Sequence, residues 1–480
     1  MSEFVSNVFK LVSGSLIAQI LAILLIPIIT RLYTPEDFGF FTLIISIATI
    51  IAVFSNLSYQ LSIMLPKDHE DAANIVTLCC ILILFSSIIT GVVIFLFADP
   101  IAYALNAPKI TSYLMFLPII VFFSAVFTVL TYWNSRRKRY GVYAIAQISN
   151  SLSSRLVQIS AGLTSASPIG LIAGYITGYL FAITVMLQGF RGDWGLFRQV
   201  TKKRMKELAV RYKKFPLFAA WSNTSLVIST QIAPLLLVYF YSPVVVGYYA
   251  IAIQVVQMPL TLIGSAVGQV FFQKACEIKN TTSDITHIVH EVHRRLISIG
   301  IFPMLLLLII GEDLFAIVLG LQWYTAGIFA KILSPWLLLV FIASPLSVIF
   351  SILERQQIEL SFNISILFSR ISVLCIGGIF LDPIWTLILF SITGVIFWGG
   401  LNLYLLKISN ISYRDGMIDY LHYFLIGLAI ASPLIILKVL WPQSVYFLCA
   451  AGVIVTIIYY ALIVSRDEIL KTSLFKIIGR

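Results

Sequence analysis

The sequence predicts an all-α polytopic membrane protein with about fourteen transmembrane helices. Hydrophobic residues make up 60% of the 480 positions and charged residues only 11%, and the mean hydropathy is +0.99. Soluble domains carry about 25% charged residues, which excludes that class. The apolar residues are grouped in runs of about 20, the length that a helix needs to cross a hydrocarbon core of about 30 Å. An internal duplication is the third observation, and it sets the order of the helices.

The predicted spans follow from the run lengths alone, so their ends are approximate to a few residues. They are Leu11–Thr30, Phe38–Tyr59, Ile75–Phe97, Ser112–Trp133, Val142–Leu163, Pro168–Gln188, Phe215–Phe240, Val246–Val270, Leu296–Gly311, Ile328–Ile352, Ile358–Leu381, Pro383–Leu406, Leu421–Trp441 and Ser444–Val464.

The duplication is clearest after the first and seventh spans. "LYTPEDFGFF", Leu32–Phe41, recurs as "FYSPVVVGYY", Phe240–Tyr249, with Pro, Gly and the two aromatic residues at matching positions. Further on, "SPIG" at Ser167 matches "DPIW" at Asp382, and each is followed by "ITG". Six spans return the chain to its starting side, so the two copies have the same orientation and are related by an axis along the membrane normal.

This repeat predicts four parts. They are an N-terminal six-helix lobe (1–190), a basic cytoplasmic linker (191–214), a C-terminal six-helix lobe (215–407), and two additional helices with a cytoplasmic tail (408–480). In such parallel repeats the binding sites tend to lie between the two copies.

The net charge of +11 is distributed unevenly. If the N-terminus is cytoplasmic, the loops on that side hold about 26 of the 32 Lys and Arg residues, including "RRKR" at Arg136–Arg139. The positive-inside rule therefore places both termini in the cytoplasm and disfavours nucleic acid as a partner. "MSEFVSNVFK" has no basic n-region, so the first span is expected to remain as an anchor. The five cysteines suggest no disulfide framework.

Two arginines, Arg155 and Arg370, lie near the middle of predicted spans. The duplication aligns Ser154-Arg155-Leu156 with Ser369-Arg370-Ile371, which makes the two arginines equivalent. An arginine at the centre of a span costs about 2.5 to 3.5 kcal/mol, so each should face a polar interior. No Asp or Glu lies deep in any predicted span, and two cations without buried anions indicate an anion that binds and leaves.

Polar residues at helical spacing support a polar interior. One stripe accompanies Arg155, a second accompanies Arg370, and a third runs along the eighth span. They consist of Gln147, Asn150, Ser151, Ser154 and Gln158; of Glu359 and Asn363; and of Gln254, Gln257, Thr261, Ser265 and Gln269. The alternatives are helix packing by the small polar residues and a structural ion pair for each arginine.

Other motifs are weaker. "HIVHEVH" spaces His287, His290 and His293 by three, so the outer two cannot converge on one helix face, and a solvated helix is favoured over a metal site. Glu36 and Asp37 resemble an acidic metal pair of a glycosyltransferase, but the repeat has valines there. "PEDF" is therefore interpreted as a turn that opens a helix.

The stretch "TRLYTPEDFGFFTLI", Thr30–Ile44, resembles the first external turn of polysaccharide-exporting members of the MOP (multidrug/oligosaccharidyl-lipid/polysaccharide) superfamily, in particular Wzx-type O-antigen flippases. The length, the span number and the six-span duplication fit this family along the whole chain. The resemblance implies a two-lobed, MATE-like fold. It also implies a non-enzymatic transporter that moves undecaprenyl-pyrophosphate-linked oligosaccharide units across the bacterial inner membrane.

The substrate that the resemblance implies fits the chemistry of the candidate residues, of which only Arg31 belongs to the family's turn motif. A pyrophosphate would suit Arg155, Arg370, Arg31 and Lys331, because guanidinium and ammonium groups bind phosphate oxygens. Sugar hydroxyls would be bound by Gln147, Asn150, Gln158, Asn363, Gln254, Gln257 and Gln269. The expected partners are the lipid-linked oligosaccharide, the bilayer and other polysaccharide assembly proteins, with no metal and no cofactor.

The energy source and three rival classes are left open. Coupling to a proton or sodium gradient, or to the membrane potential, would use carboxylates at the lumen mouths, namely Asp37, Asp99, Glu359 and Asp382. A MATE-like multidrug antiporter shares the implied fold but should carry a deep carboxylate. A polysaccharide polymerase or ligase should have a long external loop, and a membrane scaffold would not need a duplicated polar lumen.

Overall fold

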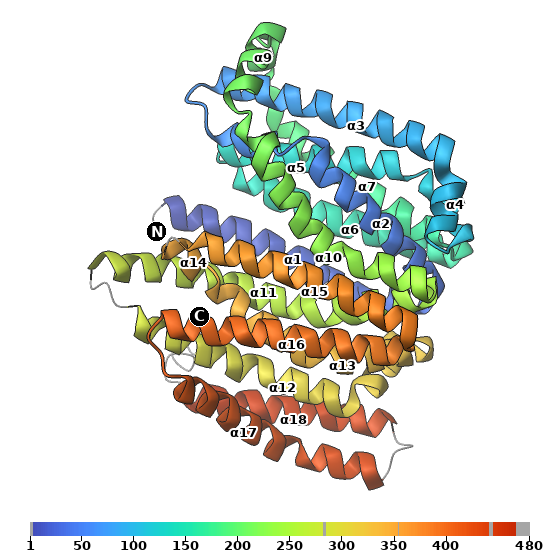
Figure 1. Cartoon of the computed structure of the whole chain (residues 1–480), viewed down its shortest axis with the longest axis vertical. Coiled ribbons are helices and arrows are strands. Elements are labelled where there is room, and N and C mark those ends of the chain that lie inside the picture. The colour runs from blue at the N-terminus through green and yellow to red at the C-terminus, as the bar shows by residue number, and fades with distance from the viewer. Residues whose placement is uncertain (1–2, 282–284, 354, 441–444, 467–480) are drawn as a thin grey trace. The chain divides into compact units, whose positions relative to one another are not determined.

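The computed structural model describes residues 3–281, 285–353, 355–440 and 445–466, and in this part of the chain all regular structure is helical (Figure 1). The long helices are α1 (Glu3–Leu32), α2 (Pro35–Ser55), α3 (His69–Ala104), α5 (Leu117–Arg136), α6 (Tyr140–Ser165), α7 (Pro168–Gln188), α10 (Ala220–Phe240), α11 (Pro243–Thr281), α12 (Thr286–Leu319), α13 (Tyr324–Leu346), α15 (Gln356–Phe380), α16 (Pro383–Ile408), α17 (Tyr413–Leu440) and α18 (Val445–Arg466). Short helices are α4 (Thr111–Leu114), α8 (Trp194–Arg198), α9 (Lys202–Arg211) and α14 (Ile349–Ile352).

The long helices correspond to the predicted spans. Within the described residues, 13 helices are long and apolar enough to cross a membrane. The long helix outside that set is α6, which has 26 residues but carries Arg155 and its polar stripe. The chain is therefore a multi-pass helical membrane protein, and the predicted number of about fourteen spans is approximate.

The chain forms two compact units. Unit 1 contains the residues up to Ala250 together with Asn363–Pro383, and unit 2 contains Ile251–Phe362 together with the residues from Ile384 on. The predicted borders of the lobes and the linker stay a prediction.

In unit 1, small residues allow close approach of α6 and α7. Gly170, Gly174 and Gly178 recur every four residues on α7, which places them on one face. A methyl group at Gly174 would overlap Gln158 and the carbonyl of Ser154, and one at Gly178 would lie 3.0 Å from the Asn150 carbonyl oxygen. Without a hydrophobic driving force in lipid, such small-residue faces are a main source of helix association.

The turn between α1 and α2 has the predicted geometry. The Thr34 hydroxyl accepts a hydrogen bond from the Asp37 backbone N–H at 3.2 Å, and the Asp37 carboxylate accepts one from the Thr34 N–H at 2.9 Å. Pro35 occupies the first turn, where its missing N–H costs nothing. The interpretation of "PEDF" as a turn and a helix start is confirmed.

Unit 2 is organised around α12. The two helices outside the repeat pack on it: the hydroxyls of Tyr459 and Tyr460 in α18 donate to the carbonyls of Ser298 and Ile299 at 2.8 and 2.9 Å. Gly427 in α17 lies against Leu305, where a larger residue would overlap the leucine side chain.

The duplication extends to a backbone break that the sequence comparison did not detect. Phe97 in α3 has φ −128° and ψ 17°, and Ile310 in α12 has φ −126° and ψ 19°. Both helices then continue for a few residues and are followed by a positive-φ residue, Asn106 (54°) and Gly320 (115°) respectively. Glycine tolerates this conformation best, and asparagine adopts it more readily than most other residues.

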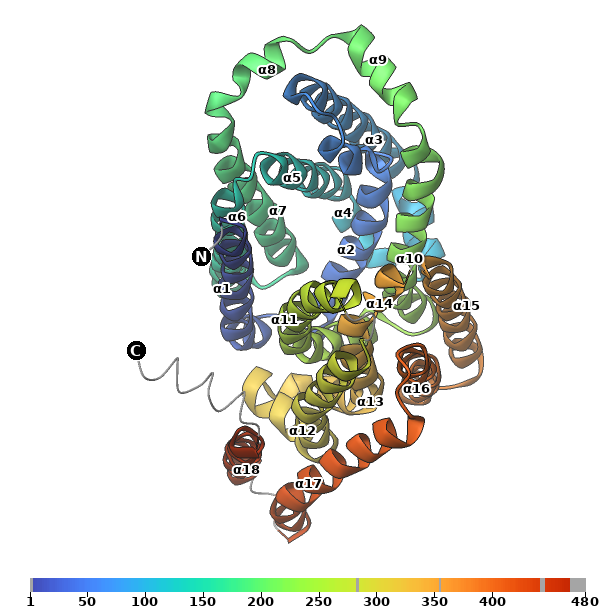
Figure 2. The ribbon, with the colours of Figure 1, turned by 90° about the vertical axis from the view of Figure 1, so that its left-hand side faces the viewer.

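The predicted basic linker is helical. Figure 2 shows that the chain continues from α7 through α8 and α9 in an arc around the ends of α3 and α5. A single π-helical turn, Phe215–Ala219, joins the arc to α10.

Candidate functional site

Arg155 is held in unit 1 by a neutral side chain. It is half-buried on α6, and its Nη1 donates a hydrogen bond to the Gln158 side-chain oxygen at 2.9 Å. No carboxylate among the described residues pairs with Arg155. The structural ion pair that the sequence left open is therefore not formed here, and the charge of the guanidinium is uncompensated by a neighbouring anion.

Gln158 connects Arg155 to two other helices. Its side chain is 2% exposed and donates to the Leu171 carbonyl of α7 at 3.2 Å, while its backbone carbonyl accepts from the Tyr33 hydroxyl at 2.7 Å. The amide therefore has defined partners on both its oxygen and its nitrogen. Gln158 positions Arg155, and its role in sugar binding stays a prediction.

The remaining polar residues of α6 are partly used in packing. The Ser151 hydroxyl donates to the Ala18 carbonyl of α1 at 2.8 Å, and Ser154 is buried against α7. Gln147 is half-buried and donates to the Tyr143 hydroxyl at 2.6 Å, and Asn150 is half-buried beside Gly178. Small polar residues on this stripe thus serve helix packing, as the alternative interpretation proposed.

Arg370 is also half-buried in unit 1, on α15. Its Nη1 donates to the Ser229 carbonyl of α10 at 2.9 Å and approaches the Ser229 hydroxyl at 3.3 Å. The guanidinium also lies close enough to Tyr249 to interact with it electrostatically. Asn363, one predicted companion, is half-buried on the same helix. The two equivalent arginines therefore have different partners.

Arg31 lies at the end of α1 and is exposed, next to the Thr34–Asp37 turn. In the same turn, Glu36 forms an ion pair with Lys109 at 3.1 Å between solvent-exposed side chains. Exposed pairs of this kind contribute about 0 to 1 kcal/mol, so the turn is held mainly by its capping bonds.

In unit 2, the third predicted stripe lines a cavity. Gln257, Thr261 and Ser265 of α11 face α13 across a space of about 590 Å³, with Gly264, Gly268 and Phe341 also in its wall. Gln254 is half-buried on the same helix, and the side chain of Gln269 lies outside the described part of the chain. The Gln257 amide and the hydroxyls of Thr261 and Ser265 on the α11 wall can hydrogen-bond a hydroxyl-rich ligand.

Lys331 lies in a charged cluster that the sequence did not predict. Its Nζ is 3.7 Å from Glu312 Oε1, and Lys438 Nζ lies 2.8 Å from the same oxygen and 3.0 Å from Asp313 Oδ2. Lys438 also donates to the carbonyl of Ile309 at 2.5 Å, beside the break in α12. Glu312 and Lys331 line a second cavity of about 650 Å³ together with Tyr324 and apolar residues of α12, α13 and α16.

A signal for this cluster was present in the sequence. "FADP", which contains Asp99, occupies the place in the first repeat that "IGED", with Glu312 and Asp313, occupies in the second. Extending the repeat comparison to these two stretches would have identified the carboxylates of Glu312 and Asp313. Lys438 belongs to the helices outside the repeat, so no alignment could have added it.

The four predicted coupling carboxylates are dispersed. Asp37 caps α2, Asp99 and Asp382 are exposed, and Glu359 is half-buried near the start of α15. Their role in coupling stays a prediction.

The predicted histidine helix contains an ion pair. His290 Nε2 lies 2.9 Å from Asp419 Oδ2 of α17, and Arg294 lies 3.7 Å from the other oxygen. Within the residues that the structure describes, no group of three His, Cys, Asp or Glu side chains is placed to hold a metal ion.

The fold is that of solved polytopic transporters. The lipid II flippase MurJ in an inward closed conformation matches with a TM-score of 0.71 and 14% identity over 96% of this chain and 99% of that one. An inward-facing multidrug resistance MATE family transporter of the MOP superfamily matches with a TM-score of 0.59 and 13% identity over 82% and 96%. These likenesses confirm the predicted MATE/MOP-like fold.

The sequence places the chain more narrowly. Residues 28–327 match the model of the polysaccharide biosynthesis protein family, and the chain belongs to that family. The lipopolysaccharide biosynthesis protein WzxC of Escherichia coli K12 is 23% identical over 390 residues, which cover 77% of this chain and 75% of WzxC. The resemblance to Wzx-type members of the MOP superfamily is thereby confirmed.

Proposed function

We propose that this protein is a flippase that moves undecaprenyl-pyrophosphate-linked oligosaccharide units, of O-antigen or a related surface polysaccharide, across the bacterial inner membrane by alternating access. Arg155 carries the proposal. It is a cation within a membrane-embedded helix, its hydrogen-bond partner Gln158 is a neutral amide, and no carboxylate in the described residues neutralises it. Because an uncompensated charge in a membrane is costly, a bound anion would lower the free energy of the loaded state.

The chemistry of the substrate fits the candidate residues of each unit, taken separately. The guanidinium groups of Arg155 and Arg370 offer planar donors to pyrophosphate oxygens. Gln257 and the hydroxyls along α11 would bind sugar hydroxyls in the unit 2 cavity. The lipid tail would stay in the bilayer. The chain acts as a transporter rather than an enzyme, and its partners include other polysaccharide assembly proteins.

The same charge argues against the rival with the same fold. A cationic drug would meet Arg155 with Coulomb repulsion that is weakly screened inside a membrane protein. Fold likeness to a MATE family transporter therefore does not by itself favour multidrug export.

Complementation of a flippase-null strain tests the proposal, with surface polysaccharide as the readout and protein level checked by immunoblot. A charge-assisted hydrogen bond to phosphate contributes about 1.5 to 3 kcal/mol, so Arg155→Ala should weaken head-group binding by about ten- to a hundredfold. Arg155→Lys should support partial export, because lysine keeps the positive charge but lacks the planar pair of donors of the guanidinium. Arg155→Glu should abolish export. Arg414→Ala, at an exposed position on α17, is the matched control. Normal polysaccharide with Arg155→Glu and Arg370→Glu together would refute the proposal.

The energy source is proposed separately. Transport would depend on the membrane potential or on an ion gradient, because each charge moved is worth about 2.3 kcal/mol per 100 mV. If flipping in vesicles is undiminished after the membrane potential and the ion gradients are collapsed, this energy source is contradicted. The protein would then be a facilitated carrier, driven by consumption of the transported product.

A further inference from the structure

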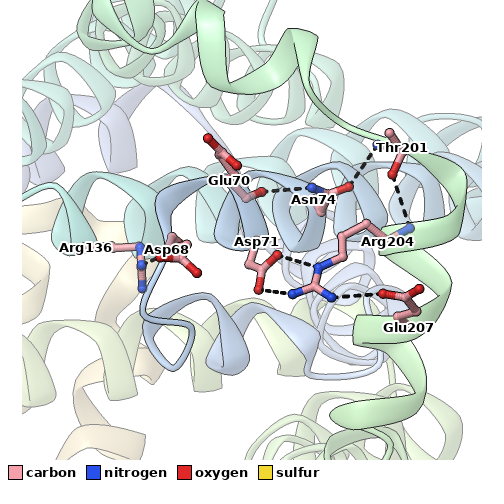
Figure 3. A network of polar contacts seen from close by, with 8 residues as sticks. All are labelled: Asp68, Glu70, Asp71, Asn74, Arg136, Thr201, Arg204 and Glu207. Atoms are coloured by element: carbon pink, nitrogen blue, oxygen red, sulfur yellow. Dashed lines mark hydrogen bonds and ion pairs between the residues drawn. The ribbon is translucent and has the colours of Figure 1, made fainter.

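The linker helix α9 is fixed to unit 1 by one of its faces. Figure 3 shows Arg204 of α9 in a fork with Asp71 of α3: Nε to Oδ1 and Nη2 to Oδ2 are both 2.7 Å. Glu207 accepts from the same guanidinium at 2.9 Å. Hydrogen bonding to Asp71, and then to Glu207, raises the pKa of Arg204 further above its usual range, so the contact stays charged at physiological pH.

Additional contacts set the angle at which α9 lies. The Thr201 N–H donates to the Asn74 side chain at 3.1 Å, and Leu208 is buried in the core formed by α3 and α5. The Ala209 carbonyl accepts from the Tyr59 hydroxyl at 2.9 Å. These contacts thus fix α9 along its length on the side that faces α3.

The beginning of the linker is fixed as well. Asp193 is fully buried, and its carboxylate is bound by Arg139 at 2.6 and 3.1 Å, by Arg137 at 3.0 Å and by the Trp133 ring N–H at 3.1 Å. The "RRKR" sequence therefore holds the linker in addition to marking the cytoplasmic side. Contacts at both ends of the linker therefore fix the direction in which its outer face points relative to the rest of unit 1.

The outer face of α9 is basic. Lys202, Lys203 and Lys206 are exposed, and none of them is part of a described ion pair. The segment 191–214 has nine Lys or Arg residues against two acidic ones, and both acids are already bound by arginines. The charge of this face is therefore not neutralised within unit 1.

Apolar side chains accompany these cations. Val210 is 59% exposed on α9, and Trp194, Phe218 and Trp221 on the flanking segments are 60%, 70% and 61% exposed. Aromatic and basic residues together are typical of the boundary between hydrocarbon and headgroups. Figures 1 and 2 agree that α9 crosses the direction of the spans at the end of α3, which is the orientation of a helix lying in the membrane surface.

We propose that the outer face of α9 is a binding site for the anionic phospholipid headgroups of the cytoplasmic leaflet. Lys202, Lys203 and Lys206 bind the phosphates, and the exposed aromatic residues enter the headgroup boundary. The two fixed points, Asp71–Arg204 and Asp193–Arg139, keep this face directed at the lipid. The occupant is inferred from charge: a polybasic surface near a membrane gains about 1 kcal/mol per Lys or Arg from anionic lipid.

Hydrogen–deuterium exchange on the full-length protein tests this site. The probe is lipid composition: nanodiscs of phosphatidylcholine alone are compared with nanodiscs in which about a third of the lipid is phosphatidylglycerol. Since each bound cation corresponds to about a fivefold change, exchange of the amides of 202–211 should slow by at least about tenfold with phosphatidylglycerol. High salt should remove the difference, because screening weakens exposed charge contacts.

A charge-matched pair of variants separates this site from a general effect of net charge. Lys202→Gln, Lys203→Gln and Lys206→Gln combined should lose most of the lipid dependence while exchanging like the parent in phosphatidylcholine, which shows that α9 is still folded. Lys274→Gln, Lys407→Gln and Arg414→Gln combined remove the same charge from exposed positions of unit 2 and should keep the full lipid dependence. Equal exchange of the parent in both lipids would overturn the proposal in favour of a solvated face. Unchanged lipid dependence in the variant that combines Lys202→Gln, Lys203→Gln and Lys206→Gln would also overturn the proposal.

Discussion

Gly39 of α2 lies directly against the backbone carbonyl of Pro243 of α11, and Gly247 lies in the same way against the carbonyl of Pro35. The four residues are the Pro and Gly of the duplicated motif, so each copy presents its glycine to the proline of the other. Gly39 N is also within 3.2 Å of the position that a side chain at Gly247 would take. The recurrence of "YTPEDFG" and "YSPVVVG" is thus explained by a reciprocal contact between two helix starts.

This contact predicts that neither glycine tolerates a methyl group. Gly39→Ala or Gly247→Ala places a carbon on a backbone oxygen, which cannot move aside as a flexible side chain would. Overpacking of this kind costs about 1 to 3 kcal/mol, and we expect a lower apparent Tm for the detergent-purified protein. Gly400→Ala in α16, where no heavy atom lies within 4 Å of the new carbon, is the control and should leave the Tm nearly unchanged. Equal Tm values for all three variants would contradict the contact.

The sequence was sufficient for the helices and for their duplication, since both depend on local patterns. Run length located α2 and α10, and "PEDF" indicated the turn that opens α2. Helical periodicity also placed Gln158 and Ser154 on one face of α6. It could not show that this face meets the glycines of α7, because a period of 3.6 defines a face and not its neighbour.

The charged residues illustrate the same limit. Glu312, Lys331 and Lys438 come from α12, α13 and α17, so only the fold brings them together. Conversely, Arg155 and Arg370 are equivalent in sequence and yet bond to Gln158 and Ser229 respectively. Their partners arise from different helix contacts, which the repeat does not determine.

Lys438 should be essential to the stability of unit 2. Replacing it by Met keeps the length of the side chain but leaves Glu312, Asp313 and the Ile309 carbonyl without their shared donor. Removal of one partner from a largely buried ionic cluster costs about 3 to 5 kcal/mol. We therefore expect a markedly lower apparent Tm for Lys438→Met.

A compensating variant distinguishes lost charge pairing from lost packing. Glu312→Gln added to Lys438→Met should restore part of the Tm, because fewer uncompensated charges remain. Lys109→Met is the control: its pair with Glu36 is exposed and should contribute about 0 to 1 kcal/mol. If Lys438→Met behaves like Lys109→Met, the cluster does not stabilise the fold.

Asp193 should govern the resistance of the linker to proteases. Asp193→Asn removes the charge that Arg137 and Arg139 share and leaves two guanidinium groups facing a neutral amide. Local opening then becomes easier, and trypsin should cleave at the basic residues of the linker faster than in the parent. Asp99→Asn, an exposed carboxylate on α3, should not change the cleavage rate. Identical digestion of Asp193→Asn and the parent would show that the buried carboxylate does not hold the linker.

The orientation of the chain can be tested at two accessible positions. The cation asymmetry places Ser135, beside the "RRKR" sequence, in the cytoplasm, and it places Lys109, whose side chain is 76% exposed, on the opposite side. Lys109→Cys should therefore react with a membrane-impermeant maleimide in spheroplasts, whereas Ser135→Cys should react only after the inner membrane is permeabilised. The parent chain, with its five native cysteines, gives the background for both. Strong labelling of Ser135→Cys before permeabilisation would reverse the orientation. Reversal would also place α9 on the outer leaflet and remove the cytoplasmic phospholipids from its reach.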